Sequence, residues 1–231
     1  MNEFNQLTEE QLFIKLLEIY DESTDHHLDH LKTLQKEKDI YLQGEMPKGV
    51  YYLKKGKVKV TQLGINGREV ILRIANSNQF VGYLSLLKGG GYRTSATCLM
   101  DSEVYFVPKS IFLKSIKTDI AFANGVIRML CDNLSCSSDE ITSLATKNVR
   151  QRLSSVLLAL DHAFNHNGGK VNGSGSVRLK KKDIASLVGT VPETLSRKLS
   201  IMENEGLLRV DDKSIHLTNR EMLIRISELG D

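Results

Sequence analysis

The sequence of 231 residues contains no tryptophan, three prolines and three cysteines. Its apolar runs all fall short of the ~18 residues that a membrane-spanning helix needs. Its first residues, MNEFNQLTEEQL, are polar and acidic, unlike a secretory signal. We therefore expect a cytoplasmic protein with no membrane partner.

The sequence also lacks the usual signs of a disulfide, metal or catalytic centre. Cys98, Cys131 and Cys136 form no CxxC pair, and their odd number argues against a disulfide framework. We expect ordinary buried thiols, with a redox or metal role as the less favoured alternative. His26 and His30 share an i, i+4 spacing, but without a matching acidic or cysteine partner a solvated helix face is favoured. Because no nucleophile–base pair stands out, we expect no enzyme.

Neither sign of charge dominates the whole chain, whose formal net charge is +3. Residues 1–147 carry 18 Lys and Arg against 18 Asp and Glu, whereas residues 148–220 carry 12 against 7. A neutral first part joined to a basic last part predicts a sensor or scaffold that carries a binder of nucleic acid or of an acidic surface.

The first half of the chain changes from helical to strand-like patterns and back. Thr8 and Gln11 have the spacing of a capping box, which predicts an amphipathic helix reaching Tyr20. From residue 31 to 107, short β-branched runs alternate with turn residues, which favours an antiparallel sandwich or barrel. Within it, VKVTQLGINGREVILRI predicts a hairpin that turns at Asn66-Gly67. The pattern becomes helical again near residue 109.

Apolar residues then repeat every seven positions, as in the seam of a coiled coil. One row is Ile120, Ile127, Leu134 and Ile141, and the row three positions further on is Ala123, Leu130, Ser137 and Leu144. We expect this seam to pair with the same helix of a second copy. The alternative is that it packs on its own β domain. Ser137, the one polar member, would set the register or face a ligand.

The last eighty residues predict a winged helix-turn-helix. After a break at Asn148 and another amphipathic helix, KKKDIASLV predicts a short helix that buries Ile184, Leu187 and Val188. Gly189 provides the turn to a second helix, which runs from near residue 190 to about 205 and ends at Gly206. The segment LLRVDDKSIHLT predicts the two strands of a wing.

The second helix of this motif has one apolar and one polar side. Leu195, Leu199 and Met202 share the first side, and Glu193, Ser196, Arg197 and Ser200 share the second. Arginine can bind guanine with two hydrogen bonds, and glutamate can accept one from cytosine. The Thr190–Glu193 spacing also suits a capping box. Because Pro192 already fixes φ in the first turn, we favour base reading for Glu193, with capping as its role when DNA is absent.

These segments together resemble the Crp/Fnr family of bacterial transcription regulators over nearly the whole chain. The resemblance implies an α+β fold with an antiparallel, jelly-roll-like β-roll sensor at 1–109, a dimerisation helix at 110–147 and a winged helix-turn-helix at 148–231. The segment PETLSRKL is similar to the family's recognition helix, and its Glu-x-x-Ser-Arg pattern resembles the Fnr branch. That branch implies that Glu193, Ser196 and Arg197 contact a TTGA-type half-site in an inverted repeat.

Further residues are assigned on the same basis. Residues expected near DNA phosphates are Lys180, Lys181, Lys182, Thr194 and Ser200. Residues expected on the dimer seam are Ile120, Ile127, Leu130, Leu134, Ile141 and Leu144. The partners implied are double-stranded DNA, a second copy of the chain and RNA polymerase. The competing hypothesis is a ligand-binding signalling protein whose winged domain contacts another protein.

The segment FVGYLSLLKGGGYRT resembles the family's phosphate-binding cassette. Residues that match its effector pocket are Gly82, Tyr83, Arg93, Thr94, Ser137 and Ser138. Tyr83 stands where the family has a ribose-binding glutamate, so cyclic AMP is expected to bind weakly or not at all. Three alternatives stay open: another small anionic or nucleotide effector uses Arg93, side chains such as Tyr83 fill the pocket, or Arg93 forms a structural salt bridge. The cysteine cluster of the iron–sulfur branch is missing from the N-terminus.

Overall fold

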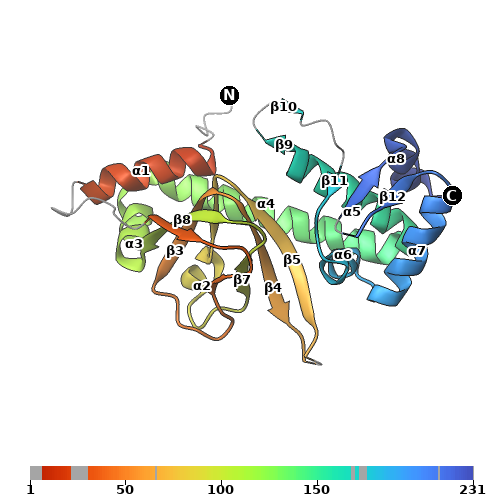
Figure 1. Cartoon of the computed structure of the whole chain (residues 1–231). Helices are drawn as coiled ribbons and strands as arrows, with labels where there is room; N and C mark the ends of the chain where they lie inside the picture. The colour runs from red at the N-terminus through yellow and green to blue at the C-terminus, as the bar shows by residue number, and fades with distance from the viewer. Residues whose placement is uncertain are drawn as a thin grey trace. The chain divides into compact units, whose positions relative to one another are not determined.

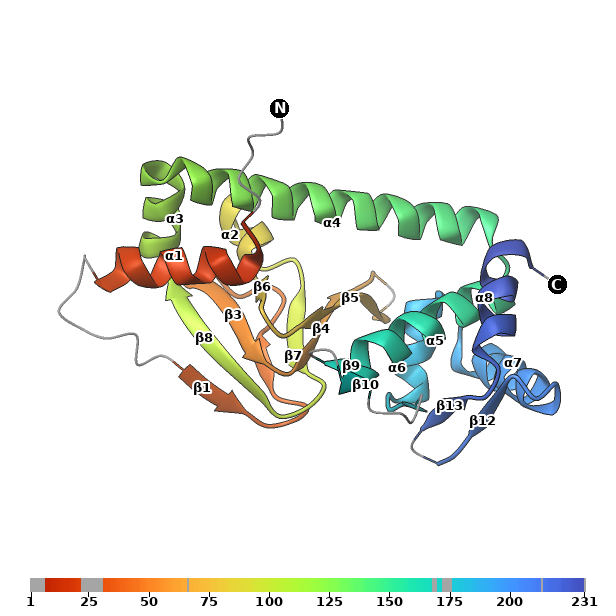
Figure 2. The same cartoon turned by 90° about the horizontal axis from the view of Figure 1, so that it is seen from above.

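The structure is a computed structural model that describes residues 7–21, 31–65, 67–167, 170–171, 176–212 and 214–230. The chain divides into two compact units, residues 1–136 and residues 137–231. Figures 1 and 2 show the elements of each unit. The long helix α4 (Ile120–Thr146) contributes residues to both.

The first unit contains two four-stranded antiparallel sheets, which confirms the expected β-roll. One sheet has the order β1-β8-β3-β6, formed by β1 (Leu31–Leu34), β8 (Ser102–Pro108), β3 (Gly49–Lys55) and β6 (Gln79–Val81). The other has the order β2-β7-β4-β5, formed by β2 (Asp39–Tyr41), β7 (Ser95–Cys98), β4 (Lys57–Leu63) and β5 (Glu69–Asn76). The predicted hairpin is β4–β5, with Gly67 at φ 73° in its turn.

Strand alternation divides the first unit into two apolar cores. On β3, Val50 and Tyr52 join the core under the helices, whereas Leu53 joins the core inside the roll. The helices over the outer face are α1 (Glu9–Asp21), α2 (Tyr83–Lys88), α3 (Lys109–Thr118) and the start of α4. The predicted capping box forms, since Thr8 and Gln11 exchange hydrogen bonds of 2.8 and 3.2 Å.

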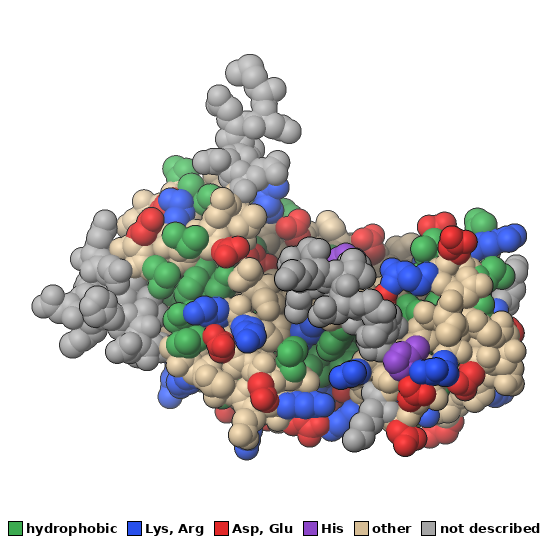
Figure 3. All heavy atoms as spheres, turned by 45° about the horizontal axis from the view of Figure 1, so that its top comes forward, with side chains coloured by type: hydrophobic (Ala, Val, Ile, Leu, Met, Phe, Trp, Pro, Cys, Tyr) green, Lys and Arg blue, Asp and Glu red, His purple; other side chains and the backbone are tan. Residues whose placement is uncertain are grey.

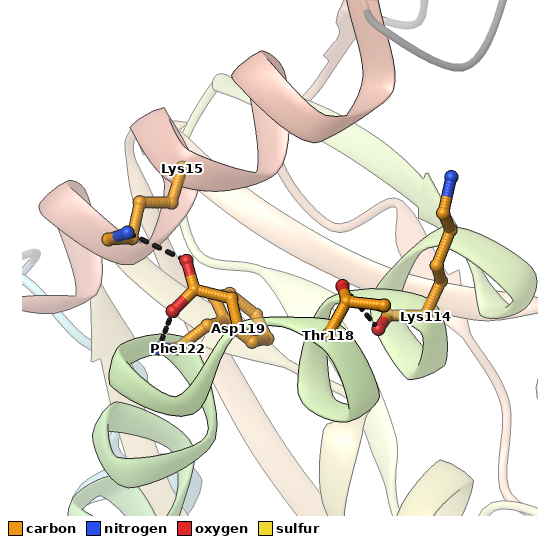
Figure 4. A network of polar contacts seen from close by, with 5 residues as sticks. All are labelled: Lys15, Lys114, Thr118, Asp119 and Phe122. Atoms are coloured by element: carbon orange, nitrogen blue, oxygen red, sulfur yellow. Dashed lines mark hydrogen bonds and ion pairs between the residues drawn. The ribbon is translucent and has the colours of Figure 1, made fainter.

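An ion pair joins the first helix to the start of the long one (Figure 4). The Asp119 carboxylate accepts hydrogen bonds from the Lys15 ammonium at 2.7 Å and from the Phe122 backbone N–H at 2.9 Å. The Lys15 hydrogen bond holds the pKa of Asp119 below its ordinary value, against a smaller opposing effect of desolvation. Asp119 thus acts as an N-terminal cap that sequence analysis missed.

The second unit contains the predicted winged helix-turn-helix. Its helices are α5 (Val149–Asn165), α6 (Lys181–Val188), α7 (Pro192–Asn204) and α8 (Arg220–Leu229). A three-stranded antiparallel sheet has the order β11-β13-β12, formed by β11 (Ser176–Val177), β13 (Ile215–Leu217) and β12 (Leu208–Val210). The short strands β9 (His166–Asn167) and β10 (Lys170–Val171) pair with each other. Sequence analysis had assigned no element to residues 219–231, where α8 packs on α5.

The predicted burial of the cysteines is wrong for two of the three. Cys98 is buried inside the β-roll, but Cys131 and Cys136 are exposed on α4. The reason is that α4 buries only one short face, formed by Phe122, Gly125, Val126 and Met129. His26 and His30 lie outside the described residues.

Candidate DNA-binding surface and anion cradle

The turn between α6 and α7 depends on a glycine. Gly189 ends α6 in the left-handed conformation, with φ 69° and ψ 43°. A Cβ atom at this position would lie 2.6 Å from Leu144 Cδ2 of α4. Any other residue would therefore meet both backbone strain and a clash, and the predicted turn is confirmed.

Helix α7 begins later than the capping-box interpretation requires. Its N-cap is Val191, which is extended at φ −100° and ψ 153°, and no side chain caps it. Proline at the first helical position explains the shift, because Pro192 has no N–H to satisfy and disfavours helical geometry in the preceding residue. Capping by Glu193 in the absence of DNA is therefore wrong.

The two faces of α7 are as predicted. Leu195, Leu199 and Met202 are at most 2% exposed and hold the helix on the core of the unit. On the other face, Glu193 and Arg197 are exposed and Ser196 is half-buried. Glu193 and Arg197 lie four residues apart, yet within the described part of the chain neither forms an ion pair or a side-chain hydrogen bond. The first two turns of α7 thus present an acceptor and a planar donor to solvent.

The residues expected near phosphates lie beside this face, on α6 and α7. Lys180 is the N-cap residue of α6, and Lys181 and Lys182 are exposed at its start. Thr194 is half-buried, whereas Ser200 is exposed and its hydroxyl donates to the Ser196 carbonyl at 3.2 Å. Helices α6 and α7 pack against each other in the second unit.

Two arginines of α5 hold this motif in place, and sequence analysis missed both. Arg150 forms a bidentate ion pair with Glu205 at the end of α7, with N–O distances of 2.9 and 2.5 Å. Arg152 donates to the Val188 carbonyl at 2.8 Å and to the Lys147 carbonyl at 2.5 Å. A cation between the carboxyl ends of α4 and α6 is favoured by both helix dipoles. Arg152 therefore connects the break after the long helix to the helix-turn-helix.

The heptad row of α4 is exposed in the single chain. Ile120, Ile127, Leu134, Ile141 and Leu144 are 55–82% exposed, and Leu130 is half-buried. The alternative that the row packs on its own β domain is therefore wrong for these five exposed residues, whereas Leu130 packs against the core under the helices, beside the buried face of α4. Large aliphatic side chains at regular spacing on one exposed helix face are typical of an interface.

Part of the expected effector pocket lies at the start of α2. Gly82 precedes α2 in the left-handed conformation, at φ 88° and ψ −12°. Thr94 is half-buried, and the Tyr41 ring from β2 packs against Gly82, with its Cε1 atom 3.4 Å from the position that a Cβ atom on Gly82 would take. We call Gly82 and Thr94 the cradle. Sequence analysis missed Tyr41, which comes from β2 and carries no local signal.

The other expected pocket residues differ in their exposure. Arg93 is exposed, and only its backbone N–H is bonded, to the Ser85 hydroxyl at 3.2 Å. Among the described residues it forms no ion pair, so the structural salt bridge is wrong. Tyr83 is buried in the core under the helices, and its hydroxyl accepts a hydrogen bond from the Asn133 amide. Ser137 and Ser138 are exposed on α4 in the second unit.

The surface carries both signs of charge. In the face drawn in Figure 3, Lys and Arg side chains are interspersed with Asp and Glu among the coloured atoms. Within the described residues, no group of three His, Cys, Asp or Glu is arranged to hold a metal ion. The same part of the chain has no helix with the length and hydropathy required to cross a membrane.

Comparison with known proteins matches both units. Residues 31–119 match the cyclic nucleotide-binding domain family, and residues 151–226 match the Crp-like helix-turn-helix domain. The chain is 26% identical over 190 residues to a CRP-like cAMP-activated global transcriptional regulator of Mycobacterium tuberculosis, covering 80% of this chain and 83% of that protein. It is 25% identical over 191 residues to the cyclic AMP receptor protein of Thermus thermophilus, covering 82% and 84%.

A solved structure shares the fold. It is a CRP/FNR-family transcriptional regulator from Thermus thermophilus, with a TM-score of 0.73 and 20% identity, covering 87% of this chain and 100% of that chain. Both domain families, the curated relatives and this fold agree with the sequence motifs of the sensor and the recognition helix. The chain belongs to the Crp/Fnr family of DNA-binding transcription regulators.

Proposed function

We propose that the chain works as a homodimer that recognises a specific inverted repeat in double-stranded DNA through the polar face of α7. The observation that carries this proposal is the exposure of Glu193 and Arg197 at the amino-terminal end of α7, where a recognition helix meets base edges. Arg197 would donate to a guanine, Glu193 would accept from a cytosine, and Ser196 would adapt to either. A TTGA-type half-site contains groups that suit this set.

The phosphate contacts would come from the surrounding surface. Lys180, Lys181 and Lys182 lie before and in the first turn of α6, where their charges can approach the DNA backbone. Thr194 and Ser200 would add hydroxyl contacts. These contacts position the protein without reading sequence, because phosphates are the same at every step.

The exposed row of α4 supports the homodimer. Two copies paired along this row would bury Ile127, Leu134 and Ile141 against each other and present two α7 helices related by twofold symmetry. The expected site is therefore an inverted repeat whose half-sites lie about one helical turn apart. We further propose the division into a sensor at 1–109, a dimerisation helix at 110–147 and a DNA-binding domain at 148–231.

The remaining partners follow from the family. RNA polymerase is the further partner of a transcription regulator, and the cytoplasm is where it would meet both DNA and polymerase. Several relatives carry cyclic AMP in their names, but the cradle of this chain does not fit a cyclic phosphate. The Tyr41 ring lies against Gly82, and no hydrogen bond or ion pair within the described residues holds the exposed Arg93 side chain at the cradle. We propose no catalytic role.

A matched pair of arginine variants tests the proposal. Arg197→Ala and Arg225→Ala each remove one positive charge from an exposed helix position, but Arg225 lies on α8. With a labelled inverted-repeat duplex, Arg197→Ala should lose roughly 1–3 kcal/mol of binding free energy and relax one base position. Arg225→Ala should retain the base preference of the wild type. Equal behaviour of the two variants would contradict the proposed reading face.

A further inference from the structure

The sensor unit contains a group of stacked tyrosines where an anionic effector would need space. The rings of Tyr41 and Tyr92 stack with centroids 4.0 Å apart and an interplanar angle of 20°. Tyr51 adds a third ring, 5.9 Å from Tyr41. Tyr41 and Tyr92 are each 4% exposed, so both rings are part of the core inside the β-roll.

These rings lie directly against the glycine of the cradle. A Cβ atom built on Gly82 would lie 3.2 Å from Tyr92 Cε1 and 3.4 Å from Tyr41 Cε1. The Tyr92 hydroxyl donates to the Gly49 carbonyl at 3.0 Å, which fixes that ring in place. The space beside Gly82, where a phosphate would need to approach the backbone, is therefore filled by aromatic carbon.

The ring that lies against Gly82 is also uncharged. Burial raises the pKa of Tyr41 above its ordinary value, so its phenol stays neutral at physiological pH. Tyr41 therefore adds aromatic bulk beside Gly82 without bringing a charge into the sensor core.

Within the described residues, the arginine expected to neutralise a phosphate forms no polar side-chain contact at this site. Arg93 is exposed, although its backbone stays close to α2 through the Ser85 hydroxyl. Arg73 is nearer to the tyrosines, and its guanidinium donates to the Phe80 carbonyl at 3.0 Å. An anion entering beside Gly82 would have to displace the Tyr41 ring from its stack. It would also need an arginine side chain to move toward it.

We propose that Tyr41 determines the ligand specificity of the sensor unit by occupying the phosphate cradle, so that the wild-type protein excludes cyclic nucleotides and binds its DNA without one. Only the second part of this inference, DNA binding without a cyclic nucleotide, rests on the proposed function. Exclusion of the ligand concerns the first unit alone and can be measured without DNA.

Calorimetry with cyclic AMP and with inorganic phosphate tests the exclusion. Wild-type protein should show no binding at micromolar concentrations of either probe. Tyr41→Ala removes the ring that lies against Gly82, so it should bind cyclic AMP at least ~10-fold more tightly than wild type. Tyr51→Ala is the matched control, because it removes a ring from the same stack without opening the cradle. Micromolar binding by wild type, or no gain in a folded Tyr41→Ala variant, would overturn the proposal.

A second substitution keeps the test decisive if Tyr41→Ala does not fold. Tyr41→Leu removes the aromatic ring but keeps an apolar side chain in the core, so it should disturb folding less than alanine does. We expect this variant to bind cyclic AMP more tightly than wild type and less tightly than Tyr41→Ala. A folded Tyr41→Leu protein with the wild-type affinity for cyclic AMP would show that the Tyr41 ring does not close the cradle.

Failure of the proposed DNA-binding function can be distinguished from failure of the cradle inference. If the wild type bound neither ligand nor any specific DNA while Tyr41→Ala gained cyclic AMP binding, the cradle inference would stand and the proposed function would fail. If DNA binding were specific but required cyclic AMP, the proposed function would stand and the inference would be overturned.

Discussion

The face of α7 and the cradle beside Gly82 both follow a left-handed glycine and both contain groups suited to binding nucleic-acid components, but they differ in what packs against them. Residues next to α7 cover only its apolar side, so Glu193 and Arg197 remain exposed. At the cradle, the ring of Tyr41 comes from a strand that is distant in sequence and packs against Gly82. The same local motif therefore becomes a binding surface or a closed site according to its long-range neighbours.

The largest expected effect comes from breaking the dimer, which should abolish specific DNA binding by α7 and leave the cradle unchanged. Leu134→Asp places a carboxylate on the exposed heptad row, where two copies would bring like charges together in an apolar seam. Desolvation and repulsion should cost several kcal/mol of dimer stability. Sedimentation should show a monomer that has lost site-specific DNA binding, while the cradle keeps its wild-type properties.

A neighbouring substitution controls for charge alone. Ser135→Asp adds the same charge at an exposed position of α4 that is outside the heptad row. It should stay dimeric and bind its site. A Leu134→Asp protein that sedimented as a dimer would move the interface to another surface.

The next effect concerns Arg152, which holds the helix-turn-helix through hydrogen bonds from α5. Arg152→Met removes both hydrogen bonds to the Lys147 and Val188 carbonyls, and each hydrogen bond from a charged group contributes about 1.5–3 kcal/mol. The second unit should unfold at lower denaturant concentration, and affinity for the specific site should fall more than affinity for random DNA. Arg152→Lys keeps the charge but cannot span both carbonyls in the same way, so it should rescue only partly. A full rescue would mean that charge alone matters.

A smaller effect should distinguish positioning from reading on the DNA-binding surface. Lys181→Ala removes one phosphate contact, so it should weaken all DNA sequences alike and reduce the slope of log K against log salt by about one. Fluorescence anisotropy at several salt concentrations measures both quantities. A change of base preference in this variant would place Lys181 at a base edge instead.

The smallest effect lies in the sensor unit and depends on pH. The Lys15 hydrogen bond lowers the pKa of Asp119, so the pair stabilises the fold above the carboxyl's ordinary pKa of 3.8, and this stability is lost as the pH falls through the lower folded value. The contribution is at most ~1 kcal/mol, since both side chains are partly exposed. Urea unfolding should show that Lys15→Met loses this stability at pH 7 and resembles wild type near pH 2. An equal deficit at both pH values would mean that the ion pair is not the cause.

Local patterns predicted the elements whose structure depends on neighbours in sequence. The hairpin β4–β5, the Thr8–Gln11 capping box, the turn at Gly189 and the buried side of α7 follow from spacing and turn chemistry within a few residues. The heptad row was recognisable because its period differs from that of the surrounding strands. Helix α8 had a usable signal in Asn219, whose side chain accepts from the Met222 N–H at 3.0 Å, but the sequence interpretation ended at the wing.

The features that sequence analysis missed depend on contacts between distant residues. Tyr41 of β2 packs against Gly82, which lies 41 positions further along the chain, and nothing in the segment IYLQG indicates where its ring will lie. The clamp of Arg150 on Glu205 spans 55 residues. The capping role of Glu193 was wrong for a local reason, because the effect of Pro192 on Val191 outweighs the Thr190–Glu193 spacing.

Selection of binding sites from a pool of random duplexes, carried out with and without cyclic AMP, tests the central claim most directly. We expect the purified protein to enrich a TTGA-like inverted repeat, with the same sequence and to the same extent in both conditions. Enrichment of no sequence would contradict base reading by α7. Enrichment only in the presence of cyclic AMP would contradict the closed cradle.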